Sequence, residues 1–168
     1  MAAARQPANP RLFTLGAAAG ERRRVARRGG TFVLTNGVFD LLHPGHASYL
    51  AAARKLAGPK GALFVALNSD ASVRRLKGPG RPILGEKARA YTLGQLRSVD
   101  GVVIFRKPRL AAEIAALRPD VYCKAGDYTV ATLDAGEREA LRKAGSRIVF
   151  LPFVKGFSTT GLARKLAR

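Results

Sequence analysis

The sequence is organised around residues 35–46, which read Thr35-Asn36-Gly37-Val38-Phe39-Asp40-Leu41-Leu42-His43-Pro44-Gly45-His46. A short apolar run, residues 31–34, precedes this segment, and an alanine-rich run, residues 47–56, follows it. This change of pattern predicts a strand, then a turn, then the start of a helix. Because a helix N-terminus offers free backbone N–H groups to anions, we interpret residues 35–46 as a phosphate-binding segment.

Both histidines of the chain, His43 and His46, lie in this segment. Side chains three positions apart on a helix project to the same side. Pro44 suits the first helical turn, and Gly45 lets a ligand approach the helix start closely. The two imidazoles could therefore hydrogen-bond the oxygens of a phosphoryl group and stabilise negative charge during its transfer.

Two other interpretations of the histidine pair are a zinc site and two structural histidines without chemistry. Structural zinc needs four protein ligands and catalytic zinc usually three. The chain has no further histidine and a single cysteine, Cys123, so the residues disfavour zinc.

The segment from Gly37 to His46 resembles the signature of the nucleotidylyltransferase superfamily, G-x-F-D-x-x-H-x-G-H. Every fixed position of this pattern is matched. A pattern with so many fixed positions is far more specific than a lone glycine motif. The resemblance implies an enzyme that transfers a nucleotidyl group.

The chain of 168 residues fits one α/β domain with a sizeable core. Five apolar strands that alternate with helices predict a Rossmann-like, doubly wound, five-stranded parallel sheet. The expected strands are residues 31–35, 62–67, 102–105, 120–124 and 147–151. The expected helices are residues 45–56, a short one from Ala71 capped by Asp70, 86–98, 108–117, 134–144 and 161–167. In such a sheet ligands bind outside the carboxyl ends of the strands, where the histidine segment falls.

Residues 1–28 are expected to form a basic, partly disordered extension with a short helix over residues 21–28, and residues 29–168 the nucleotidyltransferase domain. Lysine and arginine number 30 against 11 acidic residues, a net charge of +19. Such an excess attracts polyanions, and a basic nucleic-acid-binding protein on an inactive enzyme fold is one alternative. No aromatic residue is interleaved with the arginines of residues 22–28, which argues against a single-strand binder. An arginine-rich transit peptide is another interpretation of this segment.

No apolar run reaches the length that spans a bilayer, and no secretory signal follows the N-terminal arginines. One cysteine excludes an internal disulfide and suits a reducing compartment. We therefore expect a cytoplasmic protein without membrane insertion.

Beyond the superfamily, nearly all of the chain after Gly30 is similar to the adenylyltransferases of ADP-heptose biosynthesis, which stand alone or form the C-terminal half of a bifunctional enzyme. The similarity rests on residues 67–78 and 80–83, on Lys124-Ala125-Gly126-Asp127-Tyr128 and on Ser158-Thr159-Thr160. The sugar-kinase half of the bifunctional enzyme has no counterpart in these residues.

This resemblance implies transfer of AMP from ATP to a sugar 1-phosphate, most simply heptose 1-phosphate, with release of pyrophosphate. It implies a homodimer, and Mg²⁺ that arrives with ATP rather than on protein side chains. By position, the catalytic residues would be His43, His46, Lys77 and Arg89. The nucleotide and phosphate ligands would be Thr35, Asn36, Gly37, Phe39, Gly45, Gly126, Asp127, Ser158, Thr159 and Thr160. The acceptor substrate would meet Asp40, Asn68, Asp70 and Arg81.

Within that set, Lys77 would neutralise the attacking phosphate, and Arg89 would contact the outer phosphates of ATP. Ala125 and Ala88 depart from the family pattern, where a glycine and often an acid stand. The choice of base and sugar is thus less fixed than the phosphate chemistry. A cytidylyltransferase that uses CTP and glycerol 3-phosphate or another polyol phosphate is the main alternative.

Overall fold

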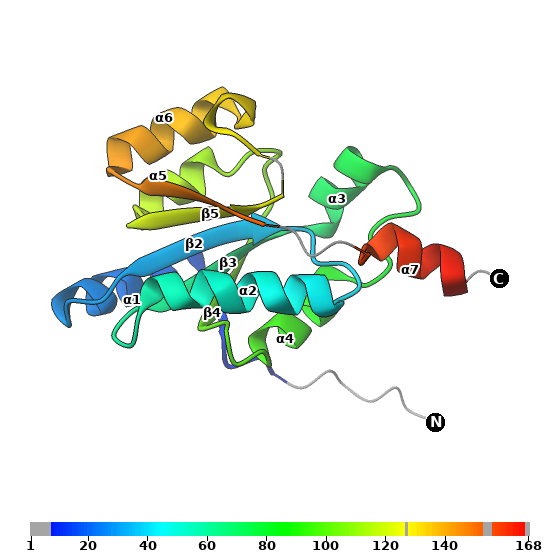
Figure 1. The fold of residues 1–168 in the computed structure, drawn as a ribbon, viewed down its shortest axis with the longest axis horizontal. Coiled ribbons are helices and arrows are strands. Elements are labelled where there is room, and N and C mark those ends of the chain that lie inside the picture. The colour runs from blue at the N-terminus through cyan, green and yellow to red at the C-terminus, as the bar shows by residue number, and fades with distance from the viewer. Residues whose placement is uncertain (1–7, 127, 153–155, 167–168) are drawn as a thin grey trace.

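The computed structural model describes residues 8–126, 128–152 and 156–166. These residues form a parallel sheet with helices on both faces (Figure 1). The strand order is β1-β4-β3-β2-β5-β6, and every neighbouring pair is parallel. The predicted doubly wound α/β class is confirmed, although the sheet has six strands rather than five.

The five expected strands are found within two residues of their predicted limits. The strands are β1 (Leu12–Phe13), β2 (Phe32–Gly37), β3 (Ala62–Asn68), β4 (Gly101–Phe105), β5 (Val121–Ala125) and β6 (Arg147–Leu151). All seven residues of β3 are buried, because helices cover the sheet on both sides. This explains why the strand sequence is an uninterrupted apolar run.

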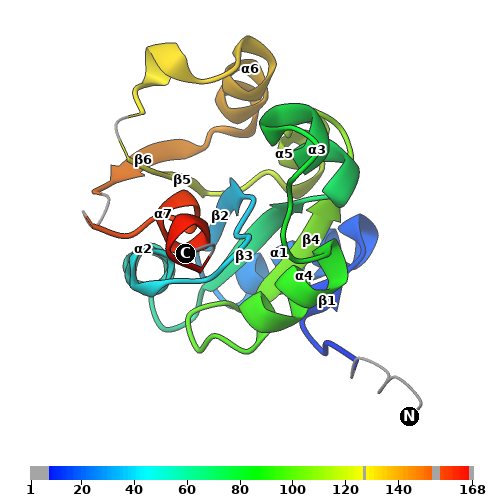
Figure 2. The same cartoon turned by 90° about the vertical axis from the view of Figure 1, so that its right-hand side faces the viewer.

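The helices are α1 (Leu15–Arg27), α2 (Pro44–Ala57), α3 (Asp70–Lys77), α4 (Glu86–Gly94), α5 (Ala111–Leu117), α6 (Ala135–Ala144) and α7 (Thr159–Leu166), with a 3-10 turn at Val130–Thr132. Helices lie on both faces of the sheet (Figure 2). One core cluster joins the sheet to α1, α5 and α6, and a second joins it to α2 and α4. None of the described helices is long and apolar enough to cross a membrane.

The N-terminal segment differs most from the expectation. Strand β1 pairs with β4, and α1 begins at Leu15 rather than at residue 21. Ala18 and Val25 of α1 are fully buried in the same core as the sheet. From residue 8 to residue 28 the chain therefore packs as part of the α/β domain, while residues 1–7 lie outside the described residues.

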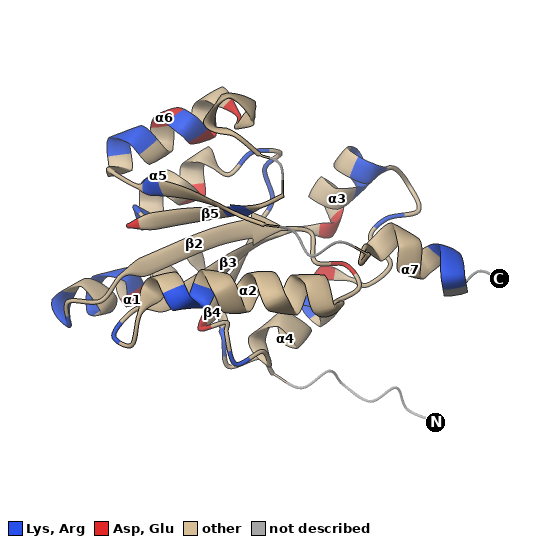
Figure 3. Cartoon of the chain, viewed as in Figure 1, with Lys and Arg blue, Asp and Glu red and all other residues tan. Residues whose placement is uncertain are grey.

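Arg11 shows how this segment is attached. Its Nη1 donates to the carbonyl oxygens of Gly94, Leu96 and Val99, at 3.0, 2.9 and 2.8 Å. These carbonyls surround the C-terminal end of α4, where a cation is favoured. One arginine of the N-terminal excess is thus structural. Further basic residues lie on α1, α2, α3, α6 and α7, and others lie in loops and strands (Figure 3).

Candidate functional site

A pocket of about 500 Å³ opens at the carboxyl ends of the central strands. The order of the sheet reverses between β2 and β5, and a doubly wound fold places its ligand at that point. The pocket is lined by the turn after β2, the end of α3, the end of β5 and the start of α6, and Thr159 of α7 also contributes. Of the predicted site residues, it brings together Asn36, Gly37, Phe39, Asp40, His46, Asn68, Lys77 and Thr159.

His43 is the N-cap of α2 and is 7% exposed. Its Nδ1 accepts a hydrogen bond of 3.3 Å from the backbone N–H of His46. A nitrogen that accepts carries the lone pair, so the neutral ring bears its proton on Nε2. The helix cap therefore fixes the tautomer in which His43 has an Nε2–H donor. Pro44 occupies the first turn of α2, as predicted.

His46 lines the pocket and stacks on His43, with ring centroids 3.8 Å apart and planes 19° apart. The prediction that both rings lie on one side is confirmed, with His43 as the cap and His46 in the helix. Burial is the largest of the causes that lower the pKa of His46 to about 4. The charges of His43 and Lys77 also lower this pKa, whereas the hydrogen bond with the Leu41 backbone raises it. The ring is therefore neutral at pH 7 in the free protein.

The ring of Phe39 packs against His46. Its ring centroid lies 5.1 Å from that of His46, and its backbone has a φ of +45°. A positive φ is unusual for a bulky residue and marks a backbone held in place by its surroundings. A Cβ on Gly37 would come within 2.8 Å of the Phe39 ring. Glycine at position 37 thus leaves room for the Phe39 ring beside His46.

Gly45 has a similar packing role for His43. A Cβ at position 45 would lie 3.0 Å from His43 Nδ1 and 3.1 Å from its Cε1. The absent side chain at position 45 makes room first for the His43 ring. The two fixed glycines of the motif therefore make room for two rings of the site, Gly37 for Phe39 and Gly45 for His43.

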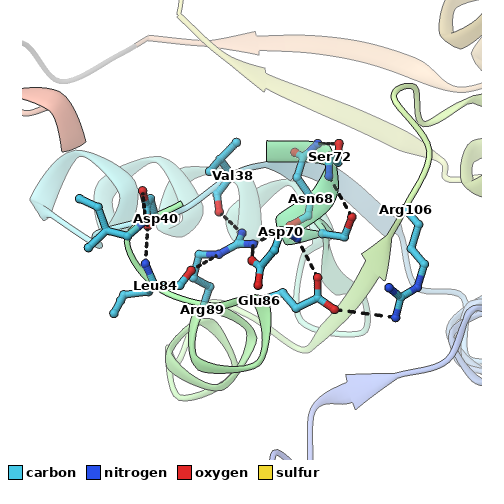
Figure 4. A network of polar contacts seen from close by, with 11 residues as sticks. Val38, Asp40, Asn68, Asp70, Ser72, Leu84, Glu86, Arg89 and Arg106 are labelled. Carbon is cyan, nitrogen blue, oxygen red and sulfur yellow. Dashed lines mark hydrogen bonds and ion pairs between the residues drawn. The ribbon is translucent and has the colours of Figure 1, made fainter. Parts of the chain in front are cut away.

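Arg89 does not line the pocket, and its surroundings do not support the predicted catalytic role. It is 1% exposed and donates to the carbonyl oxygens of Leu84, Val38 and Asn68 at 2.8, 2.6 and 2.8 Å (Figure 4). Its Nη2 also binds the Asp70 carboxylate at 2.7 Å. Arg89 thus connects the turn after β2, the end of β3 and the loop before α4 through its hydrogen bonds.

Asp40 fixes the same loop from the pocket side. Its buried carboxylate accepts from the backbone N–H groups of Ile83 and Leu84 at 2.9 and 3.0 Å, and from Arg81 at 3.1 Å. Burial alone would raise the pKa of Asp40, but these three donors lower it overall. The carboxylate is therefore already occupied by protein donors, among them Arg81, which does not line the pocket.

The helix α3 begins differently from the prediction. Ser69, rather than Asp70, is the N-cap, and its hydroxyl accepts from Ser72 N–H at 3.3 Å. The Asp70 carboxylate is instead turned towards Arg89. The side chain of Asn68 donates to the Ser72 hydroxyl at 3.0 Å, so Asn68 reaches the pocket with its amide already oriented.

The closing segment of the chain approaches the histidine turn. Ser158 caps α7 by accepting a hydrogen bond from Gly161 N–H at 3.0 Å. The Thr159 hydroxyl donates to the Leu41 carbonyl at 3.4 Å, which places the start of α7 beside the start of α2. Thr160 is exposed in the first turn of α7. Two helix N-termini therefore meet at one side of the pocket.

Two residues missed by the sequence analysis are Tyr122 and Lys124, which both point to the α6 side of β5. The Tyr122 hydroxyl donates to Asn36 Oδ1 at 2.8 Å and so orients that amide in the pocket. Lys124 lines the pocket, and its Nζ lies 5.0 Å from the centre of the Tyr128 ring. The alternation of side chains along β5 was the available signal, because positions 122 and 124 share a face.

Comparison with known proteins shows which family has this sequence pattern. The family model for cytidylyltransferase-like proteins matches residues 34–161, most of the chain. The chain belongs to the cytidylyltransferase-like family.

Curated relatives share much of this sequence. The bifunctional protein HldE of Mesorhizobium japonicum is 49% identical over 132 residues, 79% of this chain and 26% of that protein. HldE of Syntrophotalea carbinolica is 44% identical over 140 residues, 83% of this chain and 28% of the relative. The chain thus spans little more than a quarter of the length of these relatives.

A solved structure supports the fold of this cytidylyltransferase-like chain. The lipopolysaccharide core biosynthesis protein of Thermoplasma volcanium superposes with a TM-score of 0.60 at 27% identity. The match covers 77% of this chain and 100% of that one.

Of three further predicted ligands, Thr35, Gly126 and Asp127, the structure places Thr35 away from the pocket. Thr35 is fully buried; its hydroxyl donates to the Cys123 carbonyl at 3.1 Å and lies 2.6 Å from the Tyr49 hydroxyl. It supports the floor of the site and does not line the pocket. Gly126 adopts a φ of +93°, which favours glycine at this turn, and Asp127 lies outside the described residues.

Proposed function

We propose that the protein transfers AMP from ATP to a sugar 1-phosphate, with heptose 1-phosphate as the favoured acceptor, and releases pyrophosphate. The observation that carries this proposal is the stacked pair His43 and His46 at the N-terminus of α2, of which His46 lines the 500 Å³ pocket. The similarity to the HldE proteins and the family signature support the choice of reaction.

The chemistry needs no side-chain nucleophile. An oxygen of the acceptor phosphate gives an electron pair to the α-phosphorus of ATP, and a new P–O bond forms there. The bond from the α-phosphorus to the bridging oxygen breaks, and its electron pair leaves with pyrophosphate. Because the acceptor is already an anion at neutral pH, no base has to remove a proton. Alignment of the two phosphates and neutralisation of their charge should supply most of the rate.

The described residues fit this task. The Nε2–H of His43 and the free N–H groups of α2 are donors for phosphate oxygens. His46 is neutral in the free protein, and the negative charge of bound ATP would raise its pKa and favour its protonated, doubly donating form. Lys77, exposed at the end of α3 and lining the pocket, would add a positive charge on the same side. The start of α7 would receive the end of ATP that leaves as pyrophosphate.

Mg²⁺ would be bound mainly by the triphosphate and water. Among the described residues no group of three or more histidine, cysteine, aspartate or glutamate side chains could hold a metal ion. The ion would supply charge neutralisation of the phosphates, as it does in sites where protein ligands are few.

CTP is the competing nucleotide, as the family description itself suggests. A thermal-shift titration with Mg²⁺ separates the two, since a ligand at one hundred times its dissociation constant stabilises by about 2.7 kcal/mol. We expect ATP to raise the melting temperature at concentrations where CTP has little effect. A larger shift with CTP would identify a cytidylyltransferase instead.

A further inference from the structure

We infer that Lys124 binds the phosphate of the acceptor substrate, on the side of the pocket opposite the histidine pair. This inference rests on the proposed function and adds to it the location of the acceptor and the residue that holds it. It concerns a residue to which the sequence motifs assigned no role.

The first observation is the division of the pocket into two sides. His46 belongs to α2, which packs on the face of the sheet opposite α6, and the charge of Lys77 helps to lower the pKa of His46. Lys124 is influenced instead by Glu137 of α6 and by Arg109 of the loop after β4. All five residues line the same pocket. Lys124 therefore faces α6, whereas Lys77 lies within reach of the histidine turn.

The second observation is that the carboxylates beside Lys124 already have protein donors. Glu137 Oε1 accepts from Leu110 N–H at 2.9 Å. Asp134 caps α6 through Oδ1, with 3.0 Å to Gly136 N–H, and its Oδ2 lies 3.2 Å from Arg109 Nε. No carboxylate of the described residues forms an ion pair with Lys124. Among the described residues, Arg109 has an ion-pair partner in Asp134, whereas Lys124 has none and is placed to take an anion in the pocket.

The third observation concerns the aromatic rings that surround the ammonium group of Lys124. Its Nζ lies 5.0 Å from the Tyr128 ring centre and 6.0 Å from that of Tyr122. Aromatic faces attract a cation without satisfying its N–H donors. Burial lowers the pKa of Lys124, and a bound phosphate would reverse that effect. The side chain is positioned and partly desolvated, and phosphate oxygens would accept from it.

The acceptor class follows from the polar side chains that line the pocket. Asn36, Asn68 and Thr132 line it with side-chain donors and acceptors, and Tyr122 fixes the Asn36 amide. Such groups suit the hydroxyls of a sugar, whose phosphate would lie on Lys124 with one oxygen directed at the α-phosphorus.

The test is steady-state kinetics of K124M, which keeps the length of the side chain and removes its charge. With ATP and heptose 1-phosphate we expect the KM for the sugar phosphate to rise about 10- to 100-fold, as for loss of a charge-assisted hydrogen bond, while the KM for ATP stays within about threefold. K124R should recover part of the affinity. The control is K60M, because Lys60 is exposed beyond the opposite end of β3, and both KM values should stay at the wild-type level.

A direct binding measurement tests the inference without relying on turnover. Titration of heptose 1-phosphate into wild type and K124M, followed by ³¹P NMR, should show weaker binding in the variant with an unchanged melting temperature. The inference is overturned if K124M binds the sugar phosphate as wild type does, or if it loses ATP affinity instead. By contrast, a wild-type protein that binds heptose 1-phosphate through Lys124 but releases no pyrophosphate would refute the proposed function and leave this assignment in place.

Discussion

The imidazole rings of His43 and His46 are joined twice, by ring stacking at 3.8 Å and by the 3.3 Å hydrogen bond from the His46 backbone to His43 Nδ1. The bond fixes the tautomer of His43, and the stack places both rings at the N-terminus of α2. Their arrangement therefore depends on the helix cap itself. Changes that disturb the cap should alter phosphate binding even when the fold survives.

Replacing His46 by alanine should lower turnover by about 10²- to 10³-fold, which is typical for loss of one donor to a developing oxyanion. Pyrophosphate release at saturating ATP measures the effect, and circular dichroism with a melting curve checks the fold. Turnover close to wild type in a folded His46→Ala protein would remove this histidine from the mechanism.

Gly45→Ala should damage catalysis without unfolding the protein. The new Cβ would lie 3.0 Å from His43 Nδ1, so the ring must shift and the stack with it. Gly16→Ala is the matched control, because position 16 lies in α1 and a Cβ there meets nothing within 4 Å. The control should keep full activity and gain up to about 1 kcal/mol of helix stability. Equal activity of both variants would show that the His43 position does not matter.

Arg89→Lys should destabilise the fold by about 2–4 kcal/mol, since lysine cannot serve the four oxygens that the guanidinium binds and would leave buried carbonyls without donors. Urea unfolding measures the loss. Arg106→Lys, an exposed arginine 3.8 Å from Glu86, should change stability by less than about 0.5 kcal/mol. If Arg89 served the phosphates instead, Arg89→Lys would keep its stability and lose ATP affinity.

The prediction for Arg89 shows where sequence reasoning fails. Its position matches the family motif, but burial and four protein acceptors emerge only when the turn after β2, the end of β3 and the loop before α4 meet. Strand β1 was missed because two residues give no periodicity. The histidine segment and the five longer strands were predictable, since their patterns are local. Lys124 was overlooked because its neighbours on α6 lie far along the chain.

The stability of the protein should depend on pH through His46. Its pKa is lowered from 6.5 to about 4, chiefly by burial, so the unfolded chain binds more protons than the folded one between these values. The contribution is present above pH 6.5 and is lost as the pH falls towards 4. Urea unfolding of wild type and His46→Gln at pH 7, 6, 5 and 4 tests this. The variant should lose less stability over that interval, and parallel curves would contradict the assigned burial.

The most direct test of the proposed reaction is pyrophosphate release by the wild-type protein with ATP, Mg²⁺ and a panel of sugar phosphates, with CTP in parallel. We expect release with ATP that depends on an added sugar 1-phosphate and is fastest with heptose 1-phosphate. Release with CTP and glycerol 3-phosphate but not with ATP, or no release with any acceptor, would contradict the assignment.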